Sequence, residues 1–273
     1  MLQVLKEIDA LKFEKSFLDA GLRSDGRSGP LRPMEVSTGV IGSAVGSASC
    51  KLANSTRVVA GVTAGIFSFP QDTTLVSKQG RINVSCDMSL KYPGERRLAV
   101  TEGGAMSCKL EGILRNVVDV SKQLLVWRDE TNDNGPVWDL TVNIVVLNDD
   151  GGLLDCALMA AVAALKDTLL PQLHPDFRID DSLPPNKLDV GNVVPVGFTY
   201  CRFENQWLID PSADEEKLFP RLQVVMKGDS LAGMFGLEGG SEGSEIGFDM
   251  NDVLDNVIPI IQKHAPSRTN LIS

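Results

Sequence analysis

Helical spacing of apolar residues marks four stretches of the chain. In residues 1–20, apolar side chains recur three or four positions apart, and Gly21 suits the end of a helix. A second stretch of this kind covers residues 99–123. The long apolar run after Gly152 predicts a long apolar helix.

The fourth stretch predicts a C-terminal helix at residues 249–264. Asp249 is a good N-cap for this helix, and Pro259 lies where its ring would kink it. We find no linker that would separate two domains and no low-complexity tract. We therefore expect residues 1–273 to form a single domain.

Shorter runs between the helices alternate apolar and polar residues with the period of a strand. The clearest is residues 82–90, where Ile82 and Leu90 begin and end a series of apolar residues on one face. Consecutive strands outnumber strand–helix alternations, so the pattern predicts an α+β fold of mixed sheets packed with helices. The predicted strands are 34–41, 47–54, 56–67, 82–90, 138–148, 193–203, 206–210, 222–228 and 230–239.

The composition is that of an acidic globular protein. Of the 273 residues, 43% are apolar and 23% are charged, which is ordinary for this class. The net charge of −10 argues against a free-standing nucleic-acid binder, which usually carries a basic face. A local basic patch, or partners that supply positive charge, would still permit such binding.

The cysteines and histidines argue against disulfides and zinc. The five cysteines are odd in number, widely spaced and without a CxxC pair, so we expect buried free thiols in a reducing compartment. His174 and His264 lack partners at ligand spacing, and we expect no metal and no cofactor. The first residues lack the apolar core of a signal peptide, and no apolar run reaches membrane-spanning length. A cytoplasmic or nuclear protein is expected.

Two segments could carry chemistry, and each has a structural alternative. GGSEG at 239–243 matches the G-x-S-x-G pattern, but Ser241 sits in a glycine-rich hairpin flanked by acids, so we do not expect a nucleophile. The run IDPSADEE places Asp210 near three further acids that could bind Mg²⁺ or exchange protons. Such a run more often forms a solvated turn or a helix start.

The segment YPGERR places Arg96 and Arg97 side by side just after a predicted strand. Guanidinium groups at a turn match the phosphates of a nucleic-acid backbone in a bidentate way. The alternative is that both arginines pair with surface acids of this acidic protein. The residues alone favour that alternative.

The segment NDDGGLLD carries two glycines between a predicted strand and the apolar helix. This geometry can hold phosphate, because free N–H groups and the helix dipole point at the anion. Here Asp149, Asp150 and Asp155 surround the glycines, and no Arg, Lys, Ser or Thr lies between Asn148 and Ala164. Carboxylates repel an anion unless a cation intervenes, so we expect the acids themselves to satisfy the helix start.

These segments, in this order, resemble the RNase PH family. RSDGR at 23–27 resembles its R-x-D-G-R segment, and GSASCKLANSTRVVAGVTA resembles its glycine-containing hairpin. NDDGGLLD with its helix and the turn in LIDPSADEE resemble two further family motifs, and the match runs from about residue 20 to residue 264. The resemblance implies the RNase PH-like fold (ribosomal protein S5 domain 2-like). The helix before RSDGR and the lack of an S1 or KH region fit the RNase PH-like ring subunits of the eukaryotic exosome.

The resemblance also implies which residues an active member needs. Active members are phosphorolytic 3′→5′ exoribonucleases that hold phosphate on a small-Ser-Arg segment and use an Asp beyond the turn as general acid. This sequence has Gly152, Leu153 and Leu154 at the first position. Arg221 and Leu222 stand near the second. Both chemical parts are missing, and loss of one oxyanion donor alone commonly costs roughly a hundredfold in rate, so we expect no enzymatic activity.

The same resemblance implies a non-catalytic structural subunit of the exosome core ring, acting in RNA degradation and in RNA processing, rRNA processing included. Paired arginines at the corresponding place face the central channel in the family, which makes Arg96 and Arg97 candidate RNA contacts. The implied partners are other RNase PH-like subunits in a six-membered ring, S1/KH cap subunits, a hydrolytic exoribonuclease subunit and RNA threaded through the channel. The implied locations are nucleus, nucleolus and cytoplasm.

Two alternatives stay open. In the first, the chain is an active phosphorolytic 3′→5′ exoribonuclease subunit whose partner supplies the missing phosphate ligands. In the second, it is an unrelated small-molecule enzyme on an α+β fold. That second alternative needs a convergent set of pocket residues that the sequence does not show.

Overall fold

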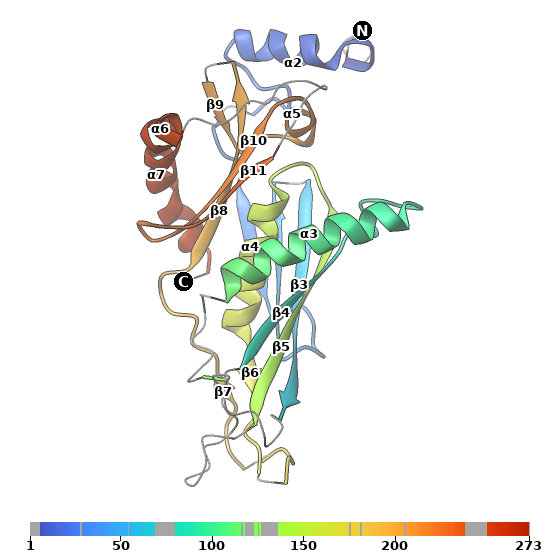
Figure 1. The fold of residues 1–273 in the computed structure, drawn as a ribbon, viewed down its shortest axis with the longest axis vertical. Coiled ribbons are helices and arrows are strands. Elements are labelled where there is room, and N and C mark those ends of the chain that lie inside the picture. The colour runs from blue at the N-terminus through green and yellow to red at the C-terminus, as the bar shows by residue number, and fades with distance from the viewer. Residues whose placement is uncertain are drawn as a thin grey trace.

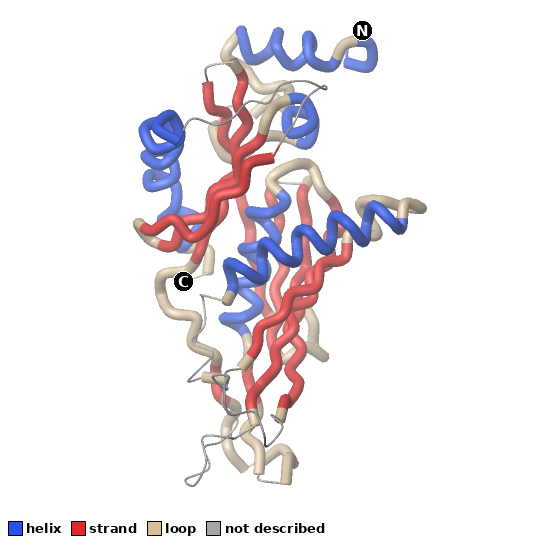
Figure 2. Tube along the Cα trace, viewed as in Figure 1, coloured by secondary structure: helices blue, strands red, loops and turns tan. Residues whose placement is uncertain are grey.

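The computed structural model contains two main β-sheets with helices packed around and between them (Figures 1 and 2). It describes residues 6–27, 29–53, 55–68, 80–115, 117, 123–124, 126, 136–174, 176–180, 182–204, 206–237 and 250–272. Within these ranges, no helix is both long and apolar enough to cross a lipid bilayer. Ser241 and Asp249 lie outside the described residues, as do the expectations attached to them.

The first sheet consists of β1 (Met34–Thr38), β2 (Gly46–Leu52), β3 (Thr56–Phe67), β4 (Arg81–Asp87) and β5 (Val137–Asn148). Their order is β1-β2-β3-β5-β4, and only the β4–β5 pair is parallel. The strand predicted at 82–90 is too long. β4 ends at Asp87, whose carboxylate accepts the Ser89 N–H (2.8 Å) and turns the chain. Leu90 is therefore 61% exposed instead of facing the core with Ile82.

The second sheet consists of β8 (Pro195–Phe203), β9 (Gln206–Ile209), β10 (Arg221–Lys227) and β11 (Ser230–Leu237). It is antiparallel throughout, in the order β11-β10-β8-β9, and all four strands correspond to predicted ones. The segment between α4 and this sheet contains a short antiparallel pair, β6 (Leu169–Leu170) and β7 (Asn186–Lys187). α5 (Ala213–Leu218) follows β9.

The helix α4 (Leu153–Asp167) lies between the two sheets, and nearly all of its residues are buried. It packs against β2 and β3 of the first sheet and against β8 of the second (Figure 1). Small residues allow this close approach, because a Cβ on Gly46 would lie 2.5 Å from the Ala164 carbonyl oxygen. The prediction of a long apolar helix after Gly152 is confirmed, and the structure adds that it is buried.

The helix α3 (Arg96–Leu114) crosses the first sheet and packs against β4 (Figure 1). It begins and ends earlier than the predicted helix at 99–123. Farther along the chain, Leu124 lies beside the sheet, where its carbonyl accepts the Trp138 N–H (2.7 Å) of β5. Leu124 is fully buried there, so its apolar side chain still joins the core.

The N-terminal helix α2 (Ala10–Asp19) is capped by the Asp9 carboxylate and ends before Gly21, as predicted. Residues 1–5 of the predicted helix lie outside the described part. Its buried residues are Phe13 and Glu14, whereas Ile8 is 78% exposed. Only the C-terminal part of the predicted apolar stripe packs, where Leu18 contacts the cluster of Cys201, Phe203 and Phe219.

The C-terminal helix comprises α6 (Met250–Asp252), the π-helical turn η1 (Val253–Val257) and α7 (Ile258–Thr269). Pro259 lies in the first turn of α7, where its missing N–H needs no helical partner. The disturbance predicted at this proline takes the form of the preceding π-helical turn. The helix runs to Thr269 and not to residue 264, because Arg268 in its last turn is anchored in the core.

Gly103 and Gly104 of α3 offer a matched pair of substitutions. A Cβ on Gly103 would overlap the Cys86 carbonyl oxygen of β4, whereas a Cβ on Gly104 would meet nothing within 4 Å. We expect Gly103→Ala to destabilise the protein by about 1–3 kcal/mol, because α3 must shift off β4. Gly104→Ala should stabilise it by about 0.5–1 kcal/mol through helix propensity. Denaturant unfolding measures both, and equal effects would contradict this packing of α3.

Candidate functional site

Gly151 and Gly152 connect β5 to α4 in a conformation that side chains disfavour. Their φ angles are 86° and 66°, in the left-handed region. A Cβ on Gly151 would lie 2.8 Å from the Ser212 carbonyl carbon, and one on Gly152 would lie 2.9 Å from a Leu52 methyl group. The loop therefore needs its glycines for steric reasons, independently of any ligand.

The N–H groups of this loop are bound by the protein's own side chains. Thr56 Oγ1 accepts the Asp150 N–H (2.9 Å), and Asp149 Oδ1 accepts the Gly151 N–H (3.0 Å). Glu216 Oε1 accepts the Gly152 N–H (2.7 Å) at the start of α4. Of the three acids expected to satisfy the helix start, only Asp149 accepts a loop N–H through its side chain, and the remaining acidic acceptor is Glu216.

Cations do lie beside the loop, contrary to the picture of three unpaired carboxylates. Lys91 Nζ lies 2.5 Å from Asp149 Oδ2, and Arg221 Nη1 donates to Glu216 Oε2 (2.8 Å). These residues come from other elements, which is why the segment after Asn148 gave no sign of them. The two carboxylates that accept loop N–H groups, those of Asp149 and Glu216, are thus each paired with a cation. An added anion would have to displace one of these two carboxylates.

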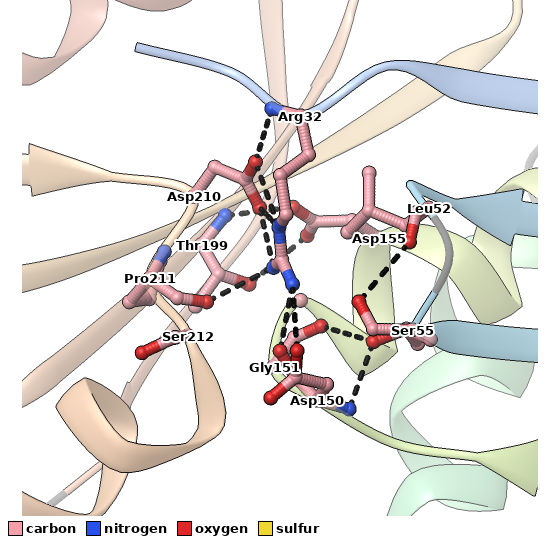
Figure 3. Close-up of polar contacts among 12 residues, drawn as sticks. Arg32, Leu52, Ser55, Asp150, Gly151, Asp155, Thr199, Asp210, Pro211 and Ser212 are labelled. Atoms are coloured by element: carbon pink, nitrogen blue, oxygen red, sulfur yellow. Dashed lines mark hydrogen bonds and ion pairs between the residues drawn. The ribbon is translucent and has the colours of Figure 1, made fainter. Parts of the chain in front are cut away.

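Arg32 and Asp210 form a buried ion pair behind the loop (Figure 3). Arg32 Nη2 donates to Asp210 Oδ1 (2.7 Å), and the Arg32 backbone N–H donates to Oδ2 (2.6 Å). The same guanidinium donates to the carbonyl oxygens of Asp150 (2.7 Å) and Pro211 (3.0 Å). Burial alone would raise the pKa of Asp210, but the hydrogen bonds and charges of Arg32 and Arg27 outweigh it and hold the pKa below its usual range.

The arginines of the RSDGR segment hold the acidic run in place. Arg27 Nη1 donates to Asp210 Oδ2 (3.0 Å), and Arg23 Nε donates to Glu215 Oε1 (2.8 Å). Glu215 also closes a capping box with Ser212 at the start of α5. The structural interpretation of this run, a helix start, is therefore confirmed. Among the described residues, no group of three His, Cys, Asp or Glu side chains is arranged to hold a metal ion.

Asp155 points away from the loop and into the core. Its carboxylate accepts the Thr199 N–H (2.9 Å) and pairs with Arg268 of α7 (3.1 Å). Burial raises the pKa of Asp155, while the Arg268 charge favours the ionised form. Asp155 and Asp210 are both buried partners of ion pairs, so a loss of activity on mutating either would not distinguish catalysis from folding.

Arg96 and Arg97 are the first two residues of α3 and not part of a turn. Both are exposed, and neither guanidinium makes an ion pair or a hydrogen bond with the described residues. Positive side chains at a helix N-terminus oppose the helix dipole, and the first turn of α3 contains no acid. The predicted pairing with surface acids is therefore not found in the described part of the chain, and both side chains are free for an external anion.

Sequence reasoning missed Arg32, Glu216 and Arg268. Arg32 lies 178 positions from Asp210, and Arg268 lies 113 positions from Asp155, so no local pattern joins either pair. Glu216 does belong to a noted acidic run, but its contact with Gly152 crosses 64 positions. Residue spacing cannot reveal such contacts, because they arise only when the two sheets assemble around α4.

Comparison with known proteins places this architecture among RNA-degrading assemblies. Residues 30–171 match the family model described as "3′ exoribonuclease family, domain 1". The chain is 31% identical over 220 residues to "Exosome complex component Rrp42" of Methanosarcina acetivorans, covering 78% of this chain and 77% of that protein.

Two solved structures are similar over almost the full length. One is titled "Archaeal exosome core", with 28% identity, a TM-score of 0.74 and coverage of 99% of this chain and 98% of the other. The second is an Archaeoglobus fulgidus exosome with RNA bound to the active site, with 27% identity, a TM-score of 0.73 and coverage of 97% of each chain. The predicted RNase PH-like α+β fold is confirmed by these matches.

The buried ion pair predicts a large and pH-dependent effect of Asp210→Asn. Leaving Arg32 and Arg27 without their carboxylate should destabilise the protein by about 3–5 kcal/mol. Because the pKa of Asp210 is lowered, its contribution is present above about pH 4 and is lost as the pH falls below that value. The variant should therefore lose less stability on acidification than the wild type.

Glu35→Gln is the matched control, because Glu35 pairs with Lys51 at an exposed site (3.4 Å). Its cost should stay within about 1 kcal/mol. Free energies of unfolding measured in denaturant across a pH series test both variants. If Asp210→Asn costs no more than Glu35→Gln, the ion pair does not hold this site together.

Proposed function

The chain belongs to the RNase PH family of 3′ exoribonucleases, and from this premise we propose that it is a non-catalytic subunit of an exosome core ring. Its relatives of similar length are named exosome components, and its fold follows that of an archaeal exosome core from end to end. In this role the chain contributes to RNA degradation and processing by building the ring and channelling RNA through it.

One observation carries the non-catalytic part of the proposal: the Gly152 N–H at the start of α4 is bound by Glu216. A phosphate would use this donor, because a helix N-terminus attracts anions. Glu216 is in turn paired with Arg221, which stands near the position where the family has its general acid. The occupied Gly152 N–H and the Glu216–Arg221 pair support the proposal that this chain holds no phosphate.

Arg96 and Arg97 support a role in guiding RNA. Neither guanidinium has a partner among the residues that the structure describes, and both lie on an acidic chain, so their positive charge is local. Phosphodiester groups are the ligands that such a pair fits best. With a net charge of −10, the chain would grip RNA only together with neighbours around the ring.

The proposed assembly includes other RNase PH-like subunits, S1/KH cap subunits and a hydrolytic exoribonuclease subunit. Edge strands β1 and β4 of the first sheet, and β9 and β11 of the second, provide places where neighbouring sheets could be extended. Exposed Leu90 and Val100 flank the two arginines and would become buried in a tight contact. Nucleus, nucleolus and cytoplasm are the proposed locations.

A phosphorolysis assay tests the absence of catalysis. The purified chain, alone and paired with an RNase PH-like partner, is incubated with 3′-tailed RNA and inorganic phosphate. The chain alone should release no nucleoside diphosphates, because Glu216 occupies the anion position. Phosphate-dependent release by the chain alone would support an active ribonuclease and contradict the proposal.

Salt dependence of RNA binding tests the two arginines in the assembled ring. Replacing both Arg96 and Arg97 by Ala should lower the magnitude of the slope of log K against log salt by about 1.4, since each contact to single-stranded RNA contributes about 0.7. Arg178→Ala is the control, because Arg178 is exposed but pairs with Asp176 (3.3 Å). An unchanged slope combined with weaker subunit pairing would show that the arginines meet a partner's acids instead.

A further inference from the structure

The Glu216 carboxylate lies at the start of α4, where a bound anion would lie. It accepts hydrogen bonds from the two donors that such an anion would use. Its Oε1 accepts the Gly152 N–H (2.7 Å), and its Oε2 accepts from Arg221 Nη1 (2.8 Å). The side chain is only 11% exposed. The N-terminus of this 15-residue helix therefore already binds a carboxylate, supplied by α5 of the same chain.

Burial raises the pKa of Glu216 and Asp149 raises it further, whereas the hydrogen bond from the Gly152 N–H and the Arg221 charge favour the ionised carboxylate. The nearby acids Asp149 and Asp210 are neutralised by Lys91 and by Arg32 with Arg27. Arg221 has Glu216 as its carboxylate partner, so removing Glu216 would leave its guanidinium uncompensated.

Lys109 of α3 lies outside this contact. Its ammonium donates to the neutral Gln223 side chain (3.3 Å) and lies over the Phe235 ring. Burial and the Arg221 charge lower the pKa of Lys109, while Glu102 raises it. A site without Glu216 would thus leave the Arg221 guanidinium without its carboxylate next to a free helix N-terminus.

We propose that Glu216 is the residue that excludes phosphate from this site, acting as a built-in anion in the place of a tetrahedral oxyanion. This inference rests on the proposed non-catalytic function and names the residue behind it. Replacing Glu216 by a small neutral residue would leave a cavity close to the size of an oxyanion, lined by the Gly152 N–H and Arg221. Such a variant would bind inorganic phosphate or sulfate, which the wild type does not.

Chemical rescue tests this role. Thermal unfolding of Glu216→Ala and Glu216→Ser is measured in chloride and in phosphate or sulfate at matched ionic strength. Both variants should unfold at lower temperature than the wild type in chloride. Phosphate and sulfate should raise their Tm by about 3–5 °C at roughly ten times the dissociation constant, with no such rise in the wild type.

Asp214→Ala is the matched control, because Asp214 lies on the same helix but pairs with Lys6 (2.5 Å). It removes one acid without touching Gly152 and should show the wild-type response. The double variant Glu216→Ala/Arg221→Met removes the cation as well and should lose the rescue. The Gly152 amide resonance, followed by NMR during phosphate titration, locates the binding in the folded single variants.

The outcomes separate this inference from the proposed function. A shift of the Gly152 amide resonance by phosphate in the wild type would overturn both, because the site would be open. If phosphate and sulfate raise the Tm of neither the wild type nor the Glu216 variants, the exclusion role alone is overturned. An equal rise in Asp214→Ala would show a general effect of the ions on an acidic protein and would also overturn it.

Discussion

The buried pair of Arg32 and Asp210 joins three parts of the chain that are far apart in sequence. It ties the segment before β1 to the turn after β9 and to the loop before α4. Either charge alone would be very unfavourable in this place, and each is stable because the other and its hydrogen bonds are present. Asp210 even adopts a left-handed φ of 54°, a conformation that surroundings must enforce on a residue with a side chain. The pair therefore sets the shape of the loop without help from a ligand.

The glycine loop between β5 and α4 can consequently have a structural role that needs no phosphate. Its glycines are required by close approach to Ser212 and Leu52, its N–H groups are satisfied internally, and its neighbouring acids are matched by cations. Asp155 and Asp210, two of the acids that the sequence offered as candidates, are buried in ion pairs that stabilise the fold. The guanidinium groups of Arg96 and Arg97, on the first turn of α3, are exposed and have no partner among the described residues.

Local patterns in the sequence predicted much of the fold and less of the site. Periodicity identified the strands of both sheets, and the apolar run after Gly152 identified the helix α4, because each depends on neighbouring residues. For the acidic run the sequence left a solvated turn and a helix start open, and the structure shows the helix start. The ordered motifs identified the family, and the comparisons confirm it. The end of β4 at Asp87 was missed, since a side-chain turn overrides propensity there, and the early end of α3 was missed as well. The sequence could not predict the partners of Asp210 and Gly152, because those partners are distant along the chain and make contact only in the folded protein.

The burial of α4 on all sides has a consequence for how the protein is made. During synthesis, α4 leaves the ribosome before β8, so the surface that later packs on the second sheet first meets water. The nascent chain must protect this Leu- and Ala-rich surface until residues of the second sheet arrive. A fragment that ended between α4 and β8 would keep an apolar face with no cover and would tend to aggregate.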